Sequence, residues 1–217
     1  MYIPNAHRLQ GVDAMRALID AYPLGAWVCH RDGALIANHI PFLLDREAGP
    51  HGTLLGHVAR GNDVWRALEP GVPSVVMFRG PQSYITPNWY PSRAAHGAVV
   101  PTWDYVAVHA HGVARVVDDP RRLRALLRRL TEANERVQAA PWSVDEAPTA
   151  YLDALLQAIV GVEIPIQRFE ARAKLSQDEA MADRLGTVRG LCAGEGGEAA
   201  ALGQWIQRAI DAEQGPA

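Results

Sequence analysis

Residues 24–44 read LGAWVCHRDGALIANHIPFLL, two apolar runs on either side of Arg31-Asp32-Gly33. A glycine that follows an aspartate supplies the positive φ that a tight hairpin turn requires. The two runs are therefore expected to form strands that pair antiparallel. Similar runs bounded by Gly, Pro, Asp and Asn continue to about residue 118, and together they predict five or six strands. The runs are Leu24–His30, Ala34–Leu44, Gly52–Val58, Val72–Arg79 and Val99–Val117.

Helical periodicity flanks this strand-rich region. Residues 11–22 place apolar side chains at helical spacing before Pro23, which predicts a short N-terminal helix. Asp118-Asp119-Pro120 is typical of a helix start, and it precedes an arginine-rich amphipathic segment expected to be helical over about 120 to 137. A second helix is expected at about 148 to 160, then a returning strand over Val162–Leu175, and then a helical tail over about 178 to 217.

Grouped short strands followed by helices and one returning strand predict a mainly β (α+β) fold, an antiparallel barrel with peripheral helices. The 217 residues are expected to form a single domain over 1–217. The chain has no Walker sequence and no GxGxxG after a strand, so a nucleotide on a glycine-rich βα turn is excluded.

The net charge of the chain also limits the kinds of partner that it can bind. With 21 basic and 24 acidic residues the formal charge is -3, which argues against nucleic-acid binding driven by bulk counterion release. Of the basic residues only Lys174 is a lysine. A long apolar span and a signal-peptide pattern are both missing from the sequence, so a cytoplasmic protein without membrane contact is expected.

The densest candidate for a binding surface is Gly80–Arg93, followed by Val100–Tyr105. These segments hold five of the chain's twelve Trp and Tyr residues, namely Tyr84, Trp89, Tyr90, Trp103 and Tyr105. Aromatic side chains with polar tips, set between prolines, suit a flat and partly polar ligand. A proline-stiffened loop that covers the end of the barrel is the alternative, and residue types alone do not separate the two.

Three smaller groups could carry chemistry. His109 and His111 share one face of the strand after Pro101, but no carboxylate or cysteine has a supporting spacing, so no metal site is predicted. His57 and Arg60 stand at a strand-to-helix junction that can hold a dianionic phosphate; a solvated Arg60 beside a capping Asn62 is the alternative. The segment Lys174–Asp178 offers an ammonium, a hydroxyl and an amide together.

Motifs for side-chain catalysis are missing. The sequence has no GxSxG elbow, no HExxH and no obvious carboxylate pair, so serine hydrolysis and zinc proteolysis are unsupported and no catalytic residue is assigned. A bound cofactor would have to supply any reactivity.

Six segments in order along the chain point to one family. They are Met1–Pro4 (MYIP), Ala37–Phe42 (ANHIPF), Gly56–Arg60 (GHVAR), Tyr84–Ser92 (YITPNWYPS), Val100–Tyr105 (VPTWDY) and Lys174–Gln177 (KLSQ). On these motifs the chain resembles the PaiB family of FMN-binding negative transcriptional regulators.

The resemblance implies an FMN-binding split β-barrel, related to pyridoxamine-phosphate-oxidase-like flavoproteins. It also implies a homodimer with two flavin sites at the subunit interface. The site residues that it implies are His57 and Arg60 at the phosphate, His39, Thr102, Trp103 and Tyr105 around the isoalloxazine, Tyr84, Trp89 and Tyr90 along the cleft, and Lys174, Ser176 and Gln177 closing it. Asp104 stands where the family commonly has Asn, and an ionised aspartate near a phosphate would repel it.

Three functions follow from the resemblance. The first is a regulator with DNA as a partner, although the sequence contains no credible helix-turn-helix. The second is a flavin-dependent oxidoreductase that acts on a small molecule, with the flavin carrying the hydride. A minority version of the second is haem binding or degradation at the same barrel, with His39 or His57 as an iron ligand. The third is a non-catalytic flavin-binding or stress-associated dimer.

Overall fold

The computed structural model describes residues 1–31, 33–68, 71–194 and 196–215, and it divides into two compact units. Unit 1 comprises Met1–Gly11, Arg79–Val108 and Ala171–Ala217, and unit 2 comprises Val12–Phe78 and His109–Glu170. Three long strands contribute residues to both units: β5 (Pro73–Ile85), β6 (Thr102–Val113) and β8 (Ile159–Lys174). The expectation of one domain over the whole chain stays a prediction.

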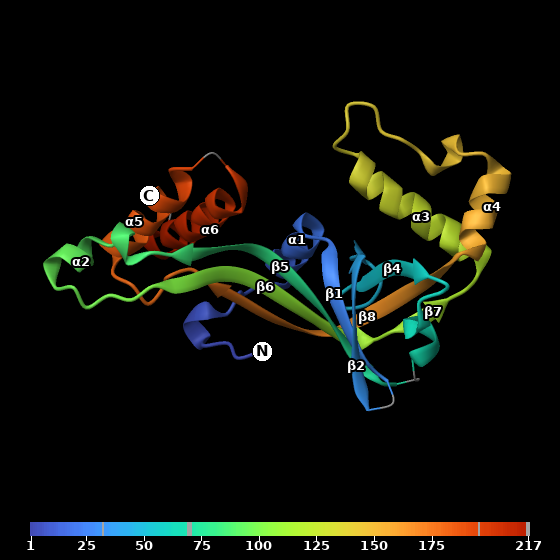
Figure 1. Cartoon of the computed structure of the whole chain (residues 1–217), viewed down its shortest axis with the longest axis horizontal. Helices are drawn as coiled ribbons and strands as arrows, with labels where there is room; N and C mark the ends of the chain where they lie inside the picture. Colours follow the sequence, from blue (N-terminus) through green and yellow to red (C-terminus); the bar gives the residue numbers. More distant parts are fainter. Residues whose placement is uncertain (32, 69–70, 195, 216–217) are drawn as a thin grey trace. The chain divides into compact units, whose positions relative to one another are not determined.

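The described strands form a sheet with the order β2-β1-β5-β6-β8-β4-β3, and β7 pairs with β8 (Figure 1). The pairs β1/β2, β1/β5, β3/β4, β4/β8 and β7/β8 are antiparallel. The other strand bounds are β1 Leu24–Arg31, β2 Ala34–Pro41, β3 Leu43–Asp45, β4 Thr53–Ala59 and β7 Arg115–Val117. This mainly antiparallel sheet agrees with the fold class expected from the sequence.

The β1/β2 hairpin confirms the pairing predicted from residues 24–44. Its register runs from Leu24 opposite Pro41 to Arg31 opposite Ala34. Gly33 has a φ of +83°, a left-handed conformation that glycine adopts without steric cost. Asp32, the other turn residue of the prediction, lies outside the described residues.

The helices of unit 2 are α1 (Val12–Ala21), α3 (Pro120–Glu135) and α4 (Thr149–Gln157), with short 3-10 turns η2 (Asp63–Ala67) and η4 (Val144–Glu146). Helix α3 begins where the sequence predicts, because the Asp119 carboxylate accepts a hydrogen bond from the Arg122 backbone N–H at 2.8 Å. Its apolar face buries Leu123, Leu126 and Leu130.

Four of the five arginines of α3 are paired with carboxylates on four other parts of unit 2. The pairs are Arg122–Glu163 (2.6 Å), Arg124–Asp153 (2.7 Å), Arg128–Asp145 (2.6 Å) and Arg129–Asp45 (2.8 Å). These contacts offset much of the positive charge of the helix. The arginine-rich face is therefore a mixed-charge surface and not a uniformly basic one.

Unit 1 contains α2 (Pro91–Ala95), α5 (Met181–Cys192) and α6 (Gly197–Gln214), with 3-10 turns η1 (Asn5–His7) and η3 (Pro87–Trp89). Helices α5 and α6 lie side by side (Figure 1). Two glycines of α5 let Trp89 approach closely: a Cβ on Gly190 would lie 2.2 Å from the indole, and one on Gly186 would lie 2.0 Å from the Trp89 carbonyl. Among the described residues, no helix is long and apolar enough to span a membrane.

Candidate functional site

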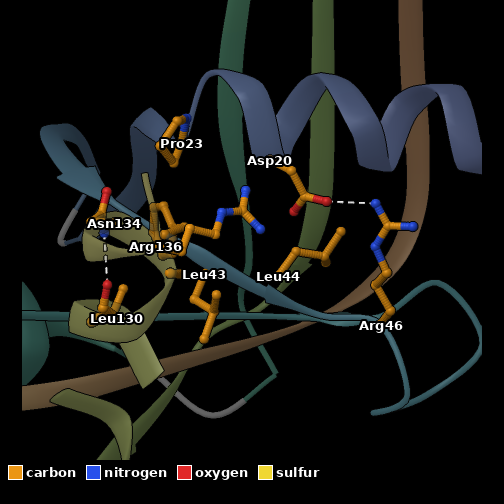
Figure 2. A pocket seen from close by; sticks show the side chains of 10 residues that line it. Asp20, Pro23, Leu43, Leu44, Arg46, Leu130, Asn134 and Arg136 are labelled. Carbon is orange, nitrogen blue, oxygen red and sulfur yellow. Dashed lines mark hydrogen bonds and ion pairs between the residues drawn. The ribbon is translucent and has the colours of Figure 1, made fainter. Parts of the chain in front are cut away.

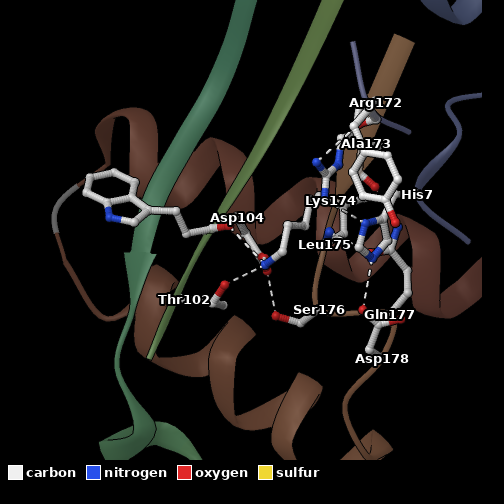
Figure 3. Close-up of polar contacts among 12 residues, drawn as sticks. His7, Thr102, Asp104, Arg172, Ala173, Lys174, Leu175, Ser176, Gln177 and Asp178 are labelled. Atoms are coloured by element: carbon white, nitrogen blue, oxygen red, sulfur yellow. Dashed lines mark hydrogen bonds and ion pairs between the residues drawn. The ribbon is translucent and has the colours of Figure 1, made fainter. Parts of the chain in front are cut away.

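Lys174, at the end of β8, is the centre of a polar cluster in unit 1 (Figure 3). Its ammonium donates to the Thr102 hydroxyl at 2.6 Å, to the Trp103 carbonyl at 3.0 Å and to Asp104 Oδ1 at 3.0 Å. An ammonium has three N–H donors, so these bonds use all of them. Lys174 therefore ties the last residues of β8 to the first residues of β6.

Asp104 is completely buried beneath this contact. Its second oxygen, Oδ2, accepts a hydrogen bond from the Ser176 hydroxyl at 2.5 Å. Ser176 itself has a φ of 56°, a left-handed conformation that is uncommon outside glycine, and its bond to Asp104 holds it there. Both carboxylate oxygens of Asp104 thus accept hydrogen bonds, and the ammonium of Lys174 compensates its negative charge.

Gln177 belongs to the same motif but bonds only to its own strand end. Its Oε1 accepts from the Leu175 N–H at 2.6 Å, and its Nε2 donates to the Ala173 carbonyl at 2.6 Å. Four predicted site residues thus lie in this region: Lys174 bonds to Thr102 and Asp104, Ser176 bonds to Asp104, and Gln177 caps the end of the strand. The hydrogen bonds of these residues join β6, the end of β8 and the segment that follows β8.

The predicted aromatic residues divide into two groups. Tyr84 on β5 and Trp103 on β6 are 47% and 55% exposed, and their ring centroids lie 6.2 Å apart in an edge-on contact. Trp89 and Tyr90 instead pack within unit 1, where Trp89 lies against the α5 glycines and burial raises the pKa of Tyr90 to about 12. Tyr84 and Trp103 are therefore exposed at the surface of unit 1, whereas Trp89 and Tyr90 pack within it.

Tyr105 stands beside a contact network that sequence reasoning did not include. The Arg172 guanidinium lies 5.4 Å from the Tyr105 ring centroid and 3.1 Å from Nδ1 of the buried His7. His7 Nε2 lies 3.1 Å from Asp178. The spacing of these residues along the sequence gives no signal, because three separate segments supply them.

Arg60, predicted to bind phosphate, directs its guanidinium at groups of unit 2. It forms two bonds to the Asp118 carboxylate, at 3.0 and 2.5 Å, and it donates to the Gln157 and Ile159 carbonyls at 2.7 and 2.9 Å. This bidentate contact lowers the pKa of Asp118. Arg60 and Asp118 also border a shallow cavity of about 310 Å³ beside α3 and α4. The hydrogen bonds of Arg60 join the end of β4 to the segments that follow α4 and β7.

A second group in unit 2 has buried polar atoms that lack hydrogen-bond partners among the described residues. Asn62 caps η2, since its Oδ1 accepts from the Val64 N–H at 3.0 Å, and its Nδ2 donates to Asn38 Oδ1 at 2.7 Å. The cap determines which atom of the Asn62 amide is the oxygen and which is the nitrogen. Because the Asn62 nitrogen must donate to an oxygen, the orientation of the Asn38 amide is determined as well. Asn38 Nδ2 is then a buried donor that has no hydrogen-bond partner among the described residues.

His57 on β4 has the same property. Its Nδ1 is buried and has no hydrogen-bond partner in the described part of the chain. Burial lowers the pKa of His57, so its imidazole is neutral at pH 7 and offers one donor and one acceptor. β2, which carries Asn38, lies against β4. His39, the neighbour of Asn38, is exposed and stands opposite Ala26 of β1.

These atoms fit the polar part of a flavin nucleotide. An amide N–H and an imidazole are donors suited to phosphate and ribityl oxygens, and buried donors without partners cost free energy that a ligand can recover. His57 was predicted from its motif, whereas Asn38 was not, although the ANHIPF segment contains it. The signal that points to Asn38 is its buried amide nitrogen, which has no hydrogen-bond partner in the described part of the chain.

Another pocket of unit 2 lies between α1, β3 and α3 and has a volume of about 210 Å³ (Figure 2). Leu43 and Leu44 contribute apolar surface, and Arg46 at its edge pairs with Asp20 at 2.5 Å. None of the predicted site residues lines this pocket among the described residues. It is a separate feature of the fold.

Comparison with known proteins identifies the family. Residues 1–168 match the family described as "Putative FMN-binding domain". The chain belongs to this FMN-binding family. "Protease synthase and sporulation protein PAI 2" of Bacillus subtilis is 31% identical over 191 residues, covering 88% of this chain and 89% of the relative. An uncharacterised protein of Emericella nidulans is 31% identical over 225 residues, covering 88% and 90%.

Solved structures confirm the fold class. The FAD and heme binding protein of Mycobacterium smegmatis superposes with a TM-score of 0.60 at 19% identity, covering 82% of this chain and 78% of that one. The flavocytochrome Anf3 of Azotobacter vinelandii gives a TM-score of 0.51 at 14% identity, covering 74% and 66%. This chain thus has the antiparallel split-barrel fold that its resemblance to the family implies.

Proposed function

We propose that this chain is an FMN-binding protein whose Asn38 and His57 hold the phosphate and ribityl oxygens of the cofactor. The observation that carries the proposal is the buried Nδ2 of Asn38, which has no hydrogen-bond partner among the described residues and whose orientation the Asn62 cap fixes. The match of residues 1–168 to an FMN-binding family supports the choice of cofactor. Bound FMN would supply hydride or electron transfer.

The protein's own residues would then bind and orient the cofactor. Asn38 donates one hydrogen bond, and the neutral His57 adds a donor or an acceptor without burying a second charge. Tyr84 and Trp103 of unit 1 are proposed as isoalloxazine contacts on the basis of the family resemblance, and their exposed aromatic faces suit a flat ring. His39, Thr102 and Tyr105 remain proposed cofactor contacts on the basis of the family resemblance, whereas Arg60, also implied by it, is proposed to support the site through its bonds to Asp118 and to the Gln157 and Ile159 carbonyls.

The proposed assembly is a homodimer with flavin sites at the subunit interface. β2 ends the strand order of the sheet, and Leu24 and Leu35 of the β1/β2 hairpin are exposed apolar side chains. An exposed apolar edge favours burial against a partner. Leu35→Glu is expected to shift the protein to monomer in size-exclusion chromatography with light scattering, whereas Ala34→Glu, at an exposed neighbouring position, is the control. A monomeric wild-type protein would contradict the dimer.

The cofactor proposal is tested by titrating the purified protein with FMN, FAD and riboflavin and recording the visible spectrum and flavin fluorescence. Asn38→Ala is expected to weaken FMN binding about tenfold, the loss of one buried hydrogen bond of about 1.4 kcal/mol. Asn134→Ala, an asparagine at the separate α1/β3/α3 pocket, is the matched control. Equal affinities of the two variants would remove Asn38 from the site. A Soret band without flavin bands would assign haem instead.

The proposed biological role is transcriptional regulation, which the resemblance to the PaiB family implies, and the relative named "Protease synthase and sporulation protein PAI 2" is consistent with it. The expected result is that promoter DNA is retarded by the protein in a gel shift and that FMN changes the affinity. The ion pairs of α3 leave little uncompensated charge for DNA, so Arg124→Glu with Arg128→Glu is expected to leave the retardation unchanged. Steady oxidation of a nicotinamide with no DNA retention would assign an oxidoreductase instead.

A further inference from the structure

The cavity of about 210 Å³ between α1, β3 and α3 combines apolar and charged side chains (Figure 2). All of its lining residues belong to unit 2. Its volume is below the ~300–1,000 Å³ that is typical of sites for drug-sized ligands, so it suits a small molecule. The apolar lining residues are Pro23, Phe42, Leu43, Leu44, Leu130 and Ala133. They offer a surface for a short hydrocarbon group.

Three of the four polar lining residues already have partners within unit 2. Arg46 Nη2 donates to Asp20 Oδ2 at 2.5 Å, so the charges of this pair compensate each other. Asn134 Nδ2 donates to the Leu130 carbonyl of its own helix at 2.7 Å. Figure 2 shows both contacts as dashed lines. These residues therefore form the wall of the cavity, and a ligand would need another charged group to hold it.

Arg136 is the fourth polar lining residue, and its guanidinium is uncommitted. Its backbone N–H caps the end of α3 by donating to the Glu132 carbonyl at 3.1 Å. Its side chain makes no hydrogen bond or ion pair with any residue that the structure describes. Figure 2 shows this side chain extending from the end of α3 into the cavity. A planar fork of N–H donors is thus available beside an apolar wall.

The charges of the lining indicate which ligand the cavity accepts. Arg46, Arg136 and Asp20 together carry one net positive charge. A ligand with one negative charge balances it, whereas a dianion would bring a second charge close to the Asp20 carboxylate. A guanidinium binds a carboxylate through two parallel N–H···O bonds. The lining therefore favours a monocarboxylate over a phosphate monoester.

We propose that the cavity binds a small monocarboxylate, with the carboxylate on Arg136 and the hydrocarbon part against Leu43 and Leu44. The ion pair supplies the orientation of the ligand, and the burial of its hydrocarbon part adds affinity. None of the proposed FMN contacts lines this cavity among the described residues. Binding of the carboxylate and binding of FMN are therefore separate properties that can be lost independently.

The test uses the full chain, with and without FMN, and two probes of similar shape, 4-methylpentanoate and the uncharged 4-methylpentanamide. Isothermal titration at pH 7.5 and constant ionic strength is expected to show the acid binding about tenfold more tightly than the amide, because the amide lacks the charge. Inorganic phosphate is expected to bind more weakly than the acid. Wild-type protein that does not bind the acid, or binds acid and amide equally, would overturn the proposal.

Arg136→Gln is expected to weaken the acid about tenfold and to leave the amide unchanged. Arg121→Gln, at an exposed arginine in the first turn of the same helix, is the matched control and is expected to bind both probes as the wild type does. Equal affinities of these two variants for the acid would remove Arg136 from the site.

Ala133→Leu tests the cavity independently of the charge, because the larger side chain fills the space that the hydrocarbon part needs. It is expected to weaken both probes, with an unchanged circular dichroism spectrum. Ala125→Leu, at an exposed position of α3 that does not line this cavity, is the control. If Ala133→Leu binds the acid as tightly as Ala125→Leu does, the acid does not occupy this cavity.

Discussion

The Lys174 ammonium lies 3.0 Å from Asp104 Oδ1, and Asp104 is completely buried while the Lys174 side chain is only 20% exposed. A carboxylate buried without its counter-ion is costly, because the interior solvates charge poorly. The pair therefore matters more for stability than the exposed ion pairs elsewhere on the chain.

Replacing Lys174 by alanine is expected to lower the free energy of unfolding by about 3 kcal/mol, since it leaves Asp104 buried and unpaired. Urea denaturation followed by tryptophan fluorescence measures the change. In the double variant Lys174→Ala/Asp104→Asn the buried charge is gone, so part of the stability is expected to return. A single variant as stable as the wild type would show that Asp104 does not need its partner.

Gly190→Ala is expected to destabilise the protein by about 1 to 3 kcal/mol, the usual range for overpacking, because the added methyl would meet the Trp89 indole at 2.2 Å. Thermal unfolding measures the loss. Gly194→Ala is the control, since no atom of the described residues, apart from its chain neighbours, lies within 4 Å of a Cβ there. If both variants melt at the same temperature, Trp89 does not pack on α5 as described.

Arg60→Ala is expected to lower the melting temperature, because the guanidinium joins Asp118 to the Gln157 and Ile159 carbonyls. Since its donors already have these acceptors, FMN and riboflavin are expected to lose affinity equally. Titration of the variant with both ligands measures the ratio. A selective loss of FMN would instead place Arg60 at the phosphate, as the family resemblance implies.

His57 is expected to make the flavin-free protein less stable as the pH falls from 7.5 to 5.5. Its pKa is lowered in the folded state, so the unfolded chain, with a pKa of about 6.5, takes up the proton first. Stability is therefore complete above pH 6.5 and decreases below it. The urea midpoint measured across this range is expected to depend less on pH in His57→Gln. An identical slope in both proteins would mean that His57 does not contribute.

Local sequence signals predicted the elements well. The turn glycine Gly33 predicted the β1/β2 hairpin, and the Asp119-Pro120 start predicted α3 to within two residues of its observed end at Glu135. Such features depend on neighbours along the chain. The sheet order was not predictable in this way, because β8 pairs with β4 across about a hundred residues and no local pattern specifies that partner.

In the candidate site, too, local motifs predicted single residues but not the residues that they contact. The motifs identified Lys174 and Arg60 as special, but their partners Asp104 and Asp118 stand 70 and 58 residues away along the chain. Only the fold shows that these cations are committed to internal carboxylates. Glu170 beside His111 is a similar case, since the spacing of His109 and His111 carries no information about a carboxylate on another strand.

Because Lys174 is the only lysine in the sequence, cleavage after it can report how often the end of β8 detaches from β6. An endoprotease specific for lysyl bonds has one target in the sequence, the peptide bond after Lys174. In the native state that bond leads into the Leu175 and Ser176 segment, which is buried, so cleavage requires β8 to detach from β6 at this end. The rate of this single cut under native conditions would thus measure how often one strand end opens, without interference from any other site.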